Sequence, residues 1–232
     1  MLASFNSYGS ALLASRAVSA FLFLWFITGL ALLAAGEPDA IERLKTGKEC
    51  LKCDLNYMEL PNAELQNVTL AGSQLNQAQL QGANLQGADL SGASLRGARL
   101  EGANLRGANL RGADLNGAFL NGVNLSVAEL GVANLRSSDL RGAYLLGAVL
   151  EGADLENANL TVADLGLANL RGSNLKDANL QSANLRGADL GKAELIGALL
   201  CNTRMPSGSV EYSGCIVPLL KQILKNPPKT QK

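Results

Sequence analysis

The chain has 232 residues, with 20 acidic and 20 basic side chains, so its formal net charge is zero. Hydrophobic residues make up 47% of it but aromatic residues only 4%, so a core must be built from aliphatic side chains. Residues 54–200 hold 15 acidic and 10 basic side chains and the flanks 5 and 10, and neither balance is that of a nucleic-acid-binding protein. The absence of histidine removes the commonest general base and metal ligand.

An apolar run over 17–35 is the first element of the chain. Arg16 precedes it and a charged stretch beginning at Glu37 follows it, so residues 1–36 are predicted to be a signal peptide or a membrane anchor. The run is long for a signal core and just long enough to span a bilayer, whereas Ala-Ala-Gly at 34–36 offers a cleavage site. Both interpretations place the rest of the chain outside the cytoplasm. A buried cytosolic helix is the weaker third interpretation, because it needs a core to receive it.

Residues 37–49 are predicted to form a short N-terminal cap helix. Pro38 suits the first turn of a helix, and Gly47 is typical of its end. The apolar face of this helix is expected to close the first coil of the segment that follows. That face consists of Ala40, Ile41 and Leu44.

Leucine occupies every fifth position from Leu55 to Leu200, thirty times without an exception. A small side chain, usually alanine, stands two residues before each leucine, and Met58 is the one bulky exception. Leucines five apart would lie about 140° from one another on an α-helix, and in a strand they would alternate between faces. Neither element buries them together. The period therefore predicts a chain that turns a quarter circle every five residues, with each leucine and its small neighbour pointing at a common axis.

Four quarter turns make a coil of twenty residues, so residues 50–205 are predicted to form a square all-β solenoid. The coils would stack at about 4.8 Å, the spacing of hydrogen-bonded strands, into a rod about 36 Å long. Glycine two places after leucine, as at Gly82 and Gly112, suits corners that need a positive φ. Asparagine or aspartate just before leucine, as at Asn84 and Asp89, can bond to nearby backbone or stack in ladders.

The five-residue unit, as in Ala83-Asn84-Leu85-Gln86-Gly87, resembles the A-(D/N)-L-x-x motif of the pentapeptide-repeat family. The resemblance implies a right-handed quadrilateral β-helix with short helical caps. Members of the family include DNA-mimicking proteins that bind type II topoisomerase, and cyanobacterial proteins of which some are exported to the periplasm or thylakoid lumen. The chain resembles these exported members, but the resemblance is much less specific for function than for fold.

Residues 206–232 are predicted to form an irregular last coil, a C-terminal cap helix and a disordered basic tail. The five-residue register continues in degenerate form through Val210 and Cys215. Pro218 can open a helix with one apolar face, and two prolines at 227–228 end it.

Four cysteines lie at the ends of the repeats, Cys50 and Cys53 at one end and Cys201 and Cys215 at the other. A shared zinc site is excluded if the rod forms, because the pairs would be about 36 Å apart and Zn–S bonds are about 2.3 Å. Cys50 and Cys53 fall in the inward register, so they are interpreted as small buried thiols or as a disulfide, and catalytic redox use is disfavoured. Similar pairs flank the repeats in exported family members, which implies a disulfide between Cys201 and Cys215.

The outer surface offers little for catalysis. Asp154 and Glu156 lie on a convex wall without a pocket that would shift a pKa, so they are interpreted as solvated. Exposed apolar residues can mark a partner surface, or they can be isolated positions that a rod tolerates. The candidate partner surface consists of Phe119 and Leu199 on one wall and Tyr144 and Leu146 on the next, while Val127, Leu167, Val132 and Val162 occupy corners.

These features predict a non-enzymatic scaffold, exported or membrane-anchored, that binds an unidentified protein in the periplasm or thylakoid lumen. It is expected to use no cofactor or metal, to bind no nucleic acid and to contact the membrane only through 17–35 if that segment stays uncleaved. DNA mimicry toward type II topoisomerase is the alternative, and it is weaker because arginines such as Arg136 and Arg171 are spread among the acids. An enzyme of unknown type is the third option.

Overall fold

The computed structural model describes residues 43–44 and 49–215, all within the unit Gly36–Lys232. The predicted signal peptide or anchor over 1–36, the helix after Pro218 and the basic tail lie outside these residues. Of the predicted cap helix over 37–49, the structure describes the helical residues Arg43 and Leu44, and Leu44 is buried against the core. Within the described ranges, no helix is long and apolar enough to cross a bilayer.

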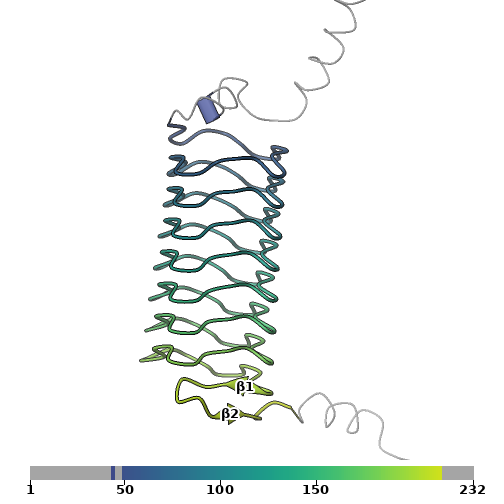
Figure 1. The fold of residues 1–232 in the computed structure, drawn as a ribbon, viewed down its shortest axis with the longest axis vertical. Helices are drawn as coiled ribbons and strands as arrows, with labels where there is room; N and C mark the ends of the chain where they lie inside the picture. Colours follow the sequence, from purple (N-terminus) through teal and green to yellow (C-terminus); the bar gives the residue numbers. More distant parts are fainter. Residues whose placement is uncertain (1–42, 45–48, 216–232) are drawn as a thin grey trace, which may run out of the picture. The chain divides into compact units, whose positions relative to one another are not determined.

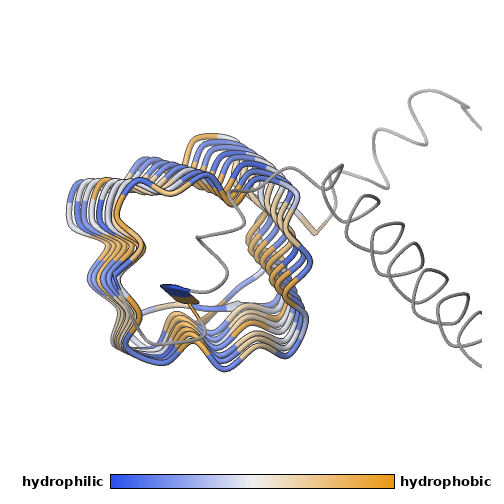
Figure 2. Ribbon diagram, turned by 90° about the horizontal axis from the view of Figure 1, so that it is seen from above, coloured by the Kyte–Doolittle hydropathy of each residue, from blue (hydrophilic) through white to orange (hydrophobic). Residues whose placement is uncertain are grey.

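From 49 onward the chain winds into stacked four-sided coils (Figures 1 and 2). Each residue that precedes a leucine forms a parallel bridge with the residue twenty positions later, from Asp54↔Gln74 to Asn184↔Arg204. The coil therefore has the twenty residues that the leucine period predicts. The bridges do not extend into longer strands, because each side of a coil has only one bridging residue between its two turns. In the described part of the chain, regular strands occur only in a C-terminal hairpin.

Every backbone N–H of a typical repeat has an acceptor, as the unit that starts at Leu110 shows. Three N–H groups donate to neighbouring coils, one donates to the leucine carbonyl three residues back, and one to the side chain before the leucine. The bonds are Leu110 N to Glu129 O (2.7 Å), Arg111 N to Asn109 Oδ1 (3.2 Å), Gly112 N to Gly131 O (3.0 Å), Ala113 N to Leu110 O (3.0 Å) and Asp114 N to Ala93 O (2.9 Å). The preference for Asn or Asp before leucine thus has a backbone cause, since this side chain accepts the N–H that no carbonyl reaches.

The second residue after each leucine has a positive φ, which is the backbone requirement of these corners. A type II turn, closed by an i to i+3 hydrogen bond, has a positive φ at its third residue, and glycine adopts this conformation without strain. Glycine fills many of these places, with Gly112 at φ 65°. Non-glycine residues hold the others, among them Val127 at 53° and Leu167 at 57°.

The interior is a solid column of leucine and alanine. Every repeat leucine from Leu70 to Leu185 is at most 1% exposed, and Met58 is buried despite its size. Serines that replace alanine keep their hydroxyls bonded, as Ser138 Oγ donates to Leu135 O (2.7 Å) and Ser173 Oγ to Leu170 O (2.8 Å). The serine hydroxyls buried in the described part of the core are therefore all hydrogen-bonded.

A hairpin, and not the expected irregular coil, ends the described solenoid. β1 (Thr203–Arg204) continues the last coil, and β2 (Val210–Glu211) pairs antiparallel with it. Pro206 occupies the second place of the reversing turn, whose Gly208 N donates to Met205 O (2.8 Å), and proline favours this place. The prediction that the five-residue register runs on beyond Met205 was wrong, because this turn reverses the chain and β2 then covers the edge of the last coil.

Asparagine side chains stack on aspartates along the walls. Asn134 Nδ2 donates to Asp114 Oδ1 (2.8 Å), and Asn174 Nδ2 to Asp154 Oδ1 (3.0 Å). No two acidic residues are bridge partners anywhere in the described coils. Because a carboxylate cannot donate and two of them repel at this spacing, an amide between two acids donates to one of them and keeps their charges apart.

We expect Leu130→Asp to destabilise the protein by about 4 kcal/mol or more, because it buries a carboxylate at the axis. Glu129→Lys, one residue earlier on the exposed wall, should change the free energy of unfolding by less than about 1 kcal/mol. Urea unfolding followed by circular dichroism measures both. Equal losses would contradict the inward and outward assignment.

Asn134→Asp should lower the free energy of unfolding by about 1 to 2 kcal/mol, because it removes the bond to Asp114 and sets three carboxylates in a row. The matched control is Asn124→Asp, whose bridge partners are Asn104 and Tyr144 and whose Oδ1 accepts the N–H of Ser126. That acceptor survives the change, so the control should lose nothing. Chemical denaturation at neutral pH compares the two, and equal effects would refute the ladder rule.

Candidate functional site

The outer walls and corners are where a ligand can bind, since the axis is filled. Two open depressions of about 580 and 470 Å³ adjoin on one wall and share Gln77 and Gln79. They are shallow and lined by amides, arginines, Tyr57 and Phe119. No group of three or more potential metal-ligating side chains occurs among the described residues.

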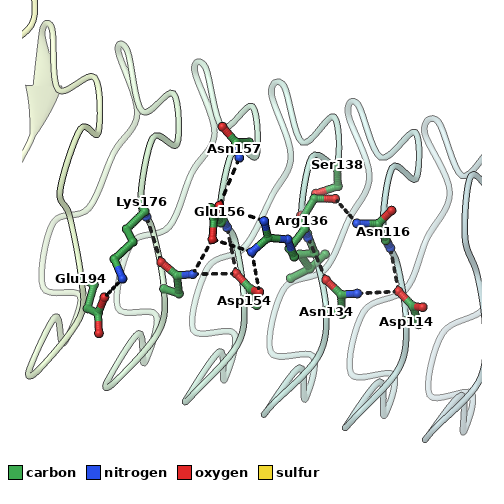
Figure 3. A network of polar contacts seen from close by, with 12 residues as sticks. Asp114, Asn116, Asn134, Arg136, Ser138, Asp154, Glu156, Asn157, Lys176 and Glu194 are labelled. Atoms are coloured by element: carbon green, nitrogen blue, oxygen red, sulfur yellow. Dashed lines mark hydrogen bonds and ion pairs between the residues drawn. The ribbon is translucent and has the colours of Figure 1, made fainter.

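One corner carries a ladder of alternating charges (Figure 3). Arg136 binds Glu156 through Nη2 (2.8 Å) and Asp154 through Nη1 (3.2 Å), and Lys176 pairs with Glu194. The hydrogen bond from Arg136 lowers the pKa of Glu156, with help from Asn174, and the same contact raises the pKa of Arg136. Asp154 and Glu156 are therefore both bound to a cation, and the lowered pKa of Glu156 disfavours that residue as a proton donor.

Four arginines and one lysine of the solenoid are neutralised in the same geometric way. Five ion pairs in the described residues join a basic side chain to an acid eighteen positions later, one coil up and diagonally across the corner. They are Arg96–Asp114, Arg111–Glu129, Arg136–Asp154, Arg171–Asp189 and Lys176–Glu194.

Arg106 and Arg186 depart from this rule. The residues eighteen positions later are Asn124 and Arg204, which offer no carboxylate. Both arginines are exposed, and neither forms an ion pair within the part of the chain that the structure describes. Their guanidinium groups are therefore available to a partner.

The four cysteines form two disulfides, one at each end of the repeats. Cys50–Cys53 closes the first turn, with Cα atoms 5.5 Å apart, and Cys201–Cys215 fastens the end of the described chain to the last coil, with Cα atoms 4.6 Å apart. Ser73 supports the first turn, because its Oγ donates to Cys50 O (2.7 Å) and accepts from Cys53 N (3.1 Å). The two alternatives for Cys50 and Cys53 combine, since the pair is both disulfide-bonded and buried.

Phe119 and Leu199 lie on one wall, as expected, but the structure does not bring them together. Phe119 is 46% exposed, and the Arg99 guanidinium lies over its ring, 5.8 Å from the centroid. Leu199 is only partly exposed, because Gly214 packs against it. A β-carbon added to Gly214 would lie 3.5 Å from Leu199 Cδ2. Four coils separate the two side chains along the wall.

Tyr144 and Leu146 belong to a continuous patch that we call the apolar corner, formed by Val127, Tyr144, Leu146 and Leu167. The exposed fractions of these four side chains are 53%, 57%, 46% and 68%, in that order. Hydrogen bonds join their coils, from Val127 N to Leu146 O (3.0 Å) and from Gly147 N to Gly166 O (2.8 Å). Sequence reasoning placed Val127 and Leu167 in one corner column but did not join them to Leu146. The signal that could have joined them is the spacing in the sequence, since Leu146 lies nineteen residues after Val127 and twenty-one before Leu167, each close to one coil of twenty.

A four-sided solenoid with a five-residue period and a buried core of leucine and alanine defines the protein as a repeat scaffold. The family model described as Pentapeptide repeats matches eight copies over 50–87, 88–126, 128–166 and 163–202. The chain belongs to the pentapeptide-repeat family.

Solved structures of the same family are similar to the chain. A pentapeptide repeat protein from the thylakoid lumen of Arabidopsis thaliana is 32% identical over 50% of this chain and 77% of its own, with a TM-score of 0.36. HetL of the cyanobacterium Nostoc, involved in heterocyst differentiation regulation, is 31% identical over 76% of this chain and all of its own, with a TM-score of 0.27. QnrB1, a plasmid-mediated fluoroquinolone resistance protein, is 19% identical over 77% of this chain and 90% of its own, with a TM-score of 0.46. No curated protein sequence matches the chain significantly.

Acid should weaken the charge ladder. The pKa of Glu156 is lowered in the folded state, so its stabilising contribution is complete above the ordinary value of 4.5 and is lost as the pH falls through the lower folded value. We therefore expect Glu156→Gln to lower the melting temperature at pH 7 and to change it less at pH 3. Glu151→Gln, which removes an exposed carboxylate without an ion pair in the described residues, should show no such pH dependence. Thermal melts from pH 7 to pH 3 test this, and parallel curves for the wild type and both variants would contradict it.

Proposed function

We propose that the chain is a non-enzymatic scaffold that binds a protein partner outside the cytoplasm. The observation that carries this proposal is the apolar corner, because four large apolar side chains stay exposed side by side on a protein whose core is already complete. Contiguous exposed apolar surface of this kind marks interaction sites more often than scattered positions do. A filled axis and shallow wall depressions support binding over catalysis.

The proposed location depends on the cysteines and the N-terminal segment. Two disulfides at the ends of the rod fit an oxidising compartment such as the periplasm or thylakoid lumen. The apolar run over 17–35 would serve as the signal peptide or membrane anchor, and N-terminal sequencing of the mature protein distinguishes these two uses. Family membership further supports a right-handed quadrilateral β-helix.

The proposed partner surface includes the residues expected from the sequence, Phe119, Tyr144, Leu146 and Leu199. Tyr144 and Leu146 contribute most, since they lie within the apolar corner. The Arg99 guanidinium lies over the ring of Phe119, and Leu199 lies against the C-terminal turn at Gly214, so both are secondary.

DNA mimicry toward type II topoisomerase receives no support from the surface charges. A mimic would present unpaired acids along its walls, whereas here Arg96, Arg136 and Arg171 neutralise acids on neighbouring coils. Inhibition of gyrase supercoiling by the purified protein at stoichiometric concentration would revive this alternative.

Chemical crosslinking and pull-down from membrane and lumenal fractions test the scaffold. We expect wild type to capture a defined partner, and the double variant Phe119→Asp, Tyr144→Asp to lose most of it, because each change puts a charge on the apolar surface. The control variant Lys192→Asp alters an exposed residue on another corner and should retain the partner. Capture of no partner by wild type, or equal capture by both variants, would count against the proposed surface.

A further inference from the structure

We infer that the apolar corner is a docking site for one amphipathic α-helix of a partner protein, with acidic residues at both ends of the helix. This inference rests on the proposed scaffold function and names the chemistry of the partner. It depends on the spacing of the apolar side chains, on the two unpaired arginines and on the backbone conformation at two corner residues.

The apolar side chains form a ridge along the rod, with one on each of three successive coils. Val127, Leu146 and Leu167 follow one another at the coil spacing of about 4.8 Å. Each leans toward a glycine of the next coil, since a Cβ built on Gly147, Gly166 or Gly187 would lie 3.5, 3.1 or 2.7 Å from the respective side chain. The ridge side chains therefore lie over these glycines and pack on the backbone of the next coil, with their outer faces left exposed.

This spacing fits a helix and not a strand. An apolar stripe at i, i+3 or i+4, and i+7 advances about 5.3 Å per side chain, so over two steps it departs from the ridge by only about 1 Å. Same-face side chains of a strand advance about 6.7 Å and would depart by about 4 Å. Adding a strand to a wall is also excluded, because the coils already pair with neighbours on both sides.

Arg106 and Arg186, both without an ion pair in the described residues, bound the ridge. Gly107 N donates to Ser126 O (3.0 Å), which sets Arg106 one coil before Val127, and Leu167 N donates to Arg186 O (3.0 Å), which sets Arg186 one coil after Leu167. Four coils, about 19 Å, therefore separate the arginines, and that distance corresponds to about 13 residues of helix. Carboxylates at both ends of the apolar stripe would complement them.

The backbone shows that folding does not select these side chains. Val127 and Leu167 hold φ values of 53° and 57°, where a β-branched or bulky residue is strained and glycine is not. Neither adds to the core, since both point outward. Val132 and Val162 share this conformation and exposure on other corners but have no apolar neighbours, so they provide matched controls.

The test measures binding of a synthetic helical peptide to the full chain by calorimetry. The probe carries leucines at i, i+4 and i+7 and glutamates about 13 residues apart around them, and a second probe carries lysines in place of the glutamates. We expect the glutamate probe to bind about tenfold more tightly than the lysine probe. The double variant Val127→Gly, Leu167→Gly should lose about tenfold in affinity for the glutamate probe without a lower melting temperature.

The control Val132→Gly, Val162→Gly relieves the same backbone strain and should leave affinity unchanged. The charge-reversal variant Arg106→Glu, Arg186→Glu should prefer the lysine probe. Absent binding, equal affinity of the two glycine variants, or dissociation of a wild-type dimer by Val127→Gly, Leu167→Gly in sedimentation would each overturn the inference. If the Val127→Gly, Leu167→Gly variant still captures a partner on crosslinking, only the docking site is refuted and the proposed scaffold function stands.

Discussion

Burial of a leucine and a small side chain every five residues is the constraint on which the structure depends. It requires a quarter turn between successive leucines, and that turn requires a positive φ two places after each leucine. The same turn leaves one N–H without a carbonyl, and the Asx side chain before the leucine accepts it in most repeats, as Asn109 does for Arg111. Core, corner and wall residues are thus three consequences of one geometric requirement.

Features that repeat with the coil could be predicted from the sequence. The inward places of Leu130 and Met58, the glycine corners and the ends marked by Cys53 and Cys201 all follow from the five-residue register. The terminal hairpin could not, because a degenerate register fits both another coil and a reversal, and only the turn at Pro206 decides between them.

The candidate site was harder to predict because it depends on contacts between coils. Arg136 pairs with Asp154 eighteen residues away, and Leu146 extends the patch that Val127 begins nineteen residues earlier. Hydropathy along the chain shows each of these residues as isolated. Once a coil of twenty is established, residues at such separations become neighbours. Arg106 and Arg186 then emerge as arginines with no carboxylate at the diagonal position and no ion pair in the described residues. The exposure of Phe119 was foreseen, but its cover by Arg99 required side-chain positions.

A filled axis also changes how strain is interpreted in this protein. In a globular enzyme, an outlying φ often lies beside a catalytic group, whereas here positive φ is the rule at every corner and by itself marks nothing. What distinguishes Val127 and Leu167 is that side chains unsuited to the turn stand next to other exposed apolar groups, on a corner bounded by unpaired cations. Val132 and Val162 share the backbone strain but not the exposed apolar neighbours, so they separate tolerated strain from selection for binding. If these four corner residues were merely tolerated, replacement by glycine would have the same effect on peptide affinity at all four positions. If binding selects Val127 and Leu167, only their replacement would weaken binding, because only these two border Leu146.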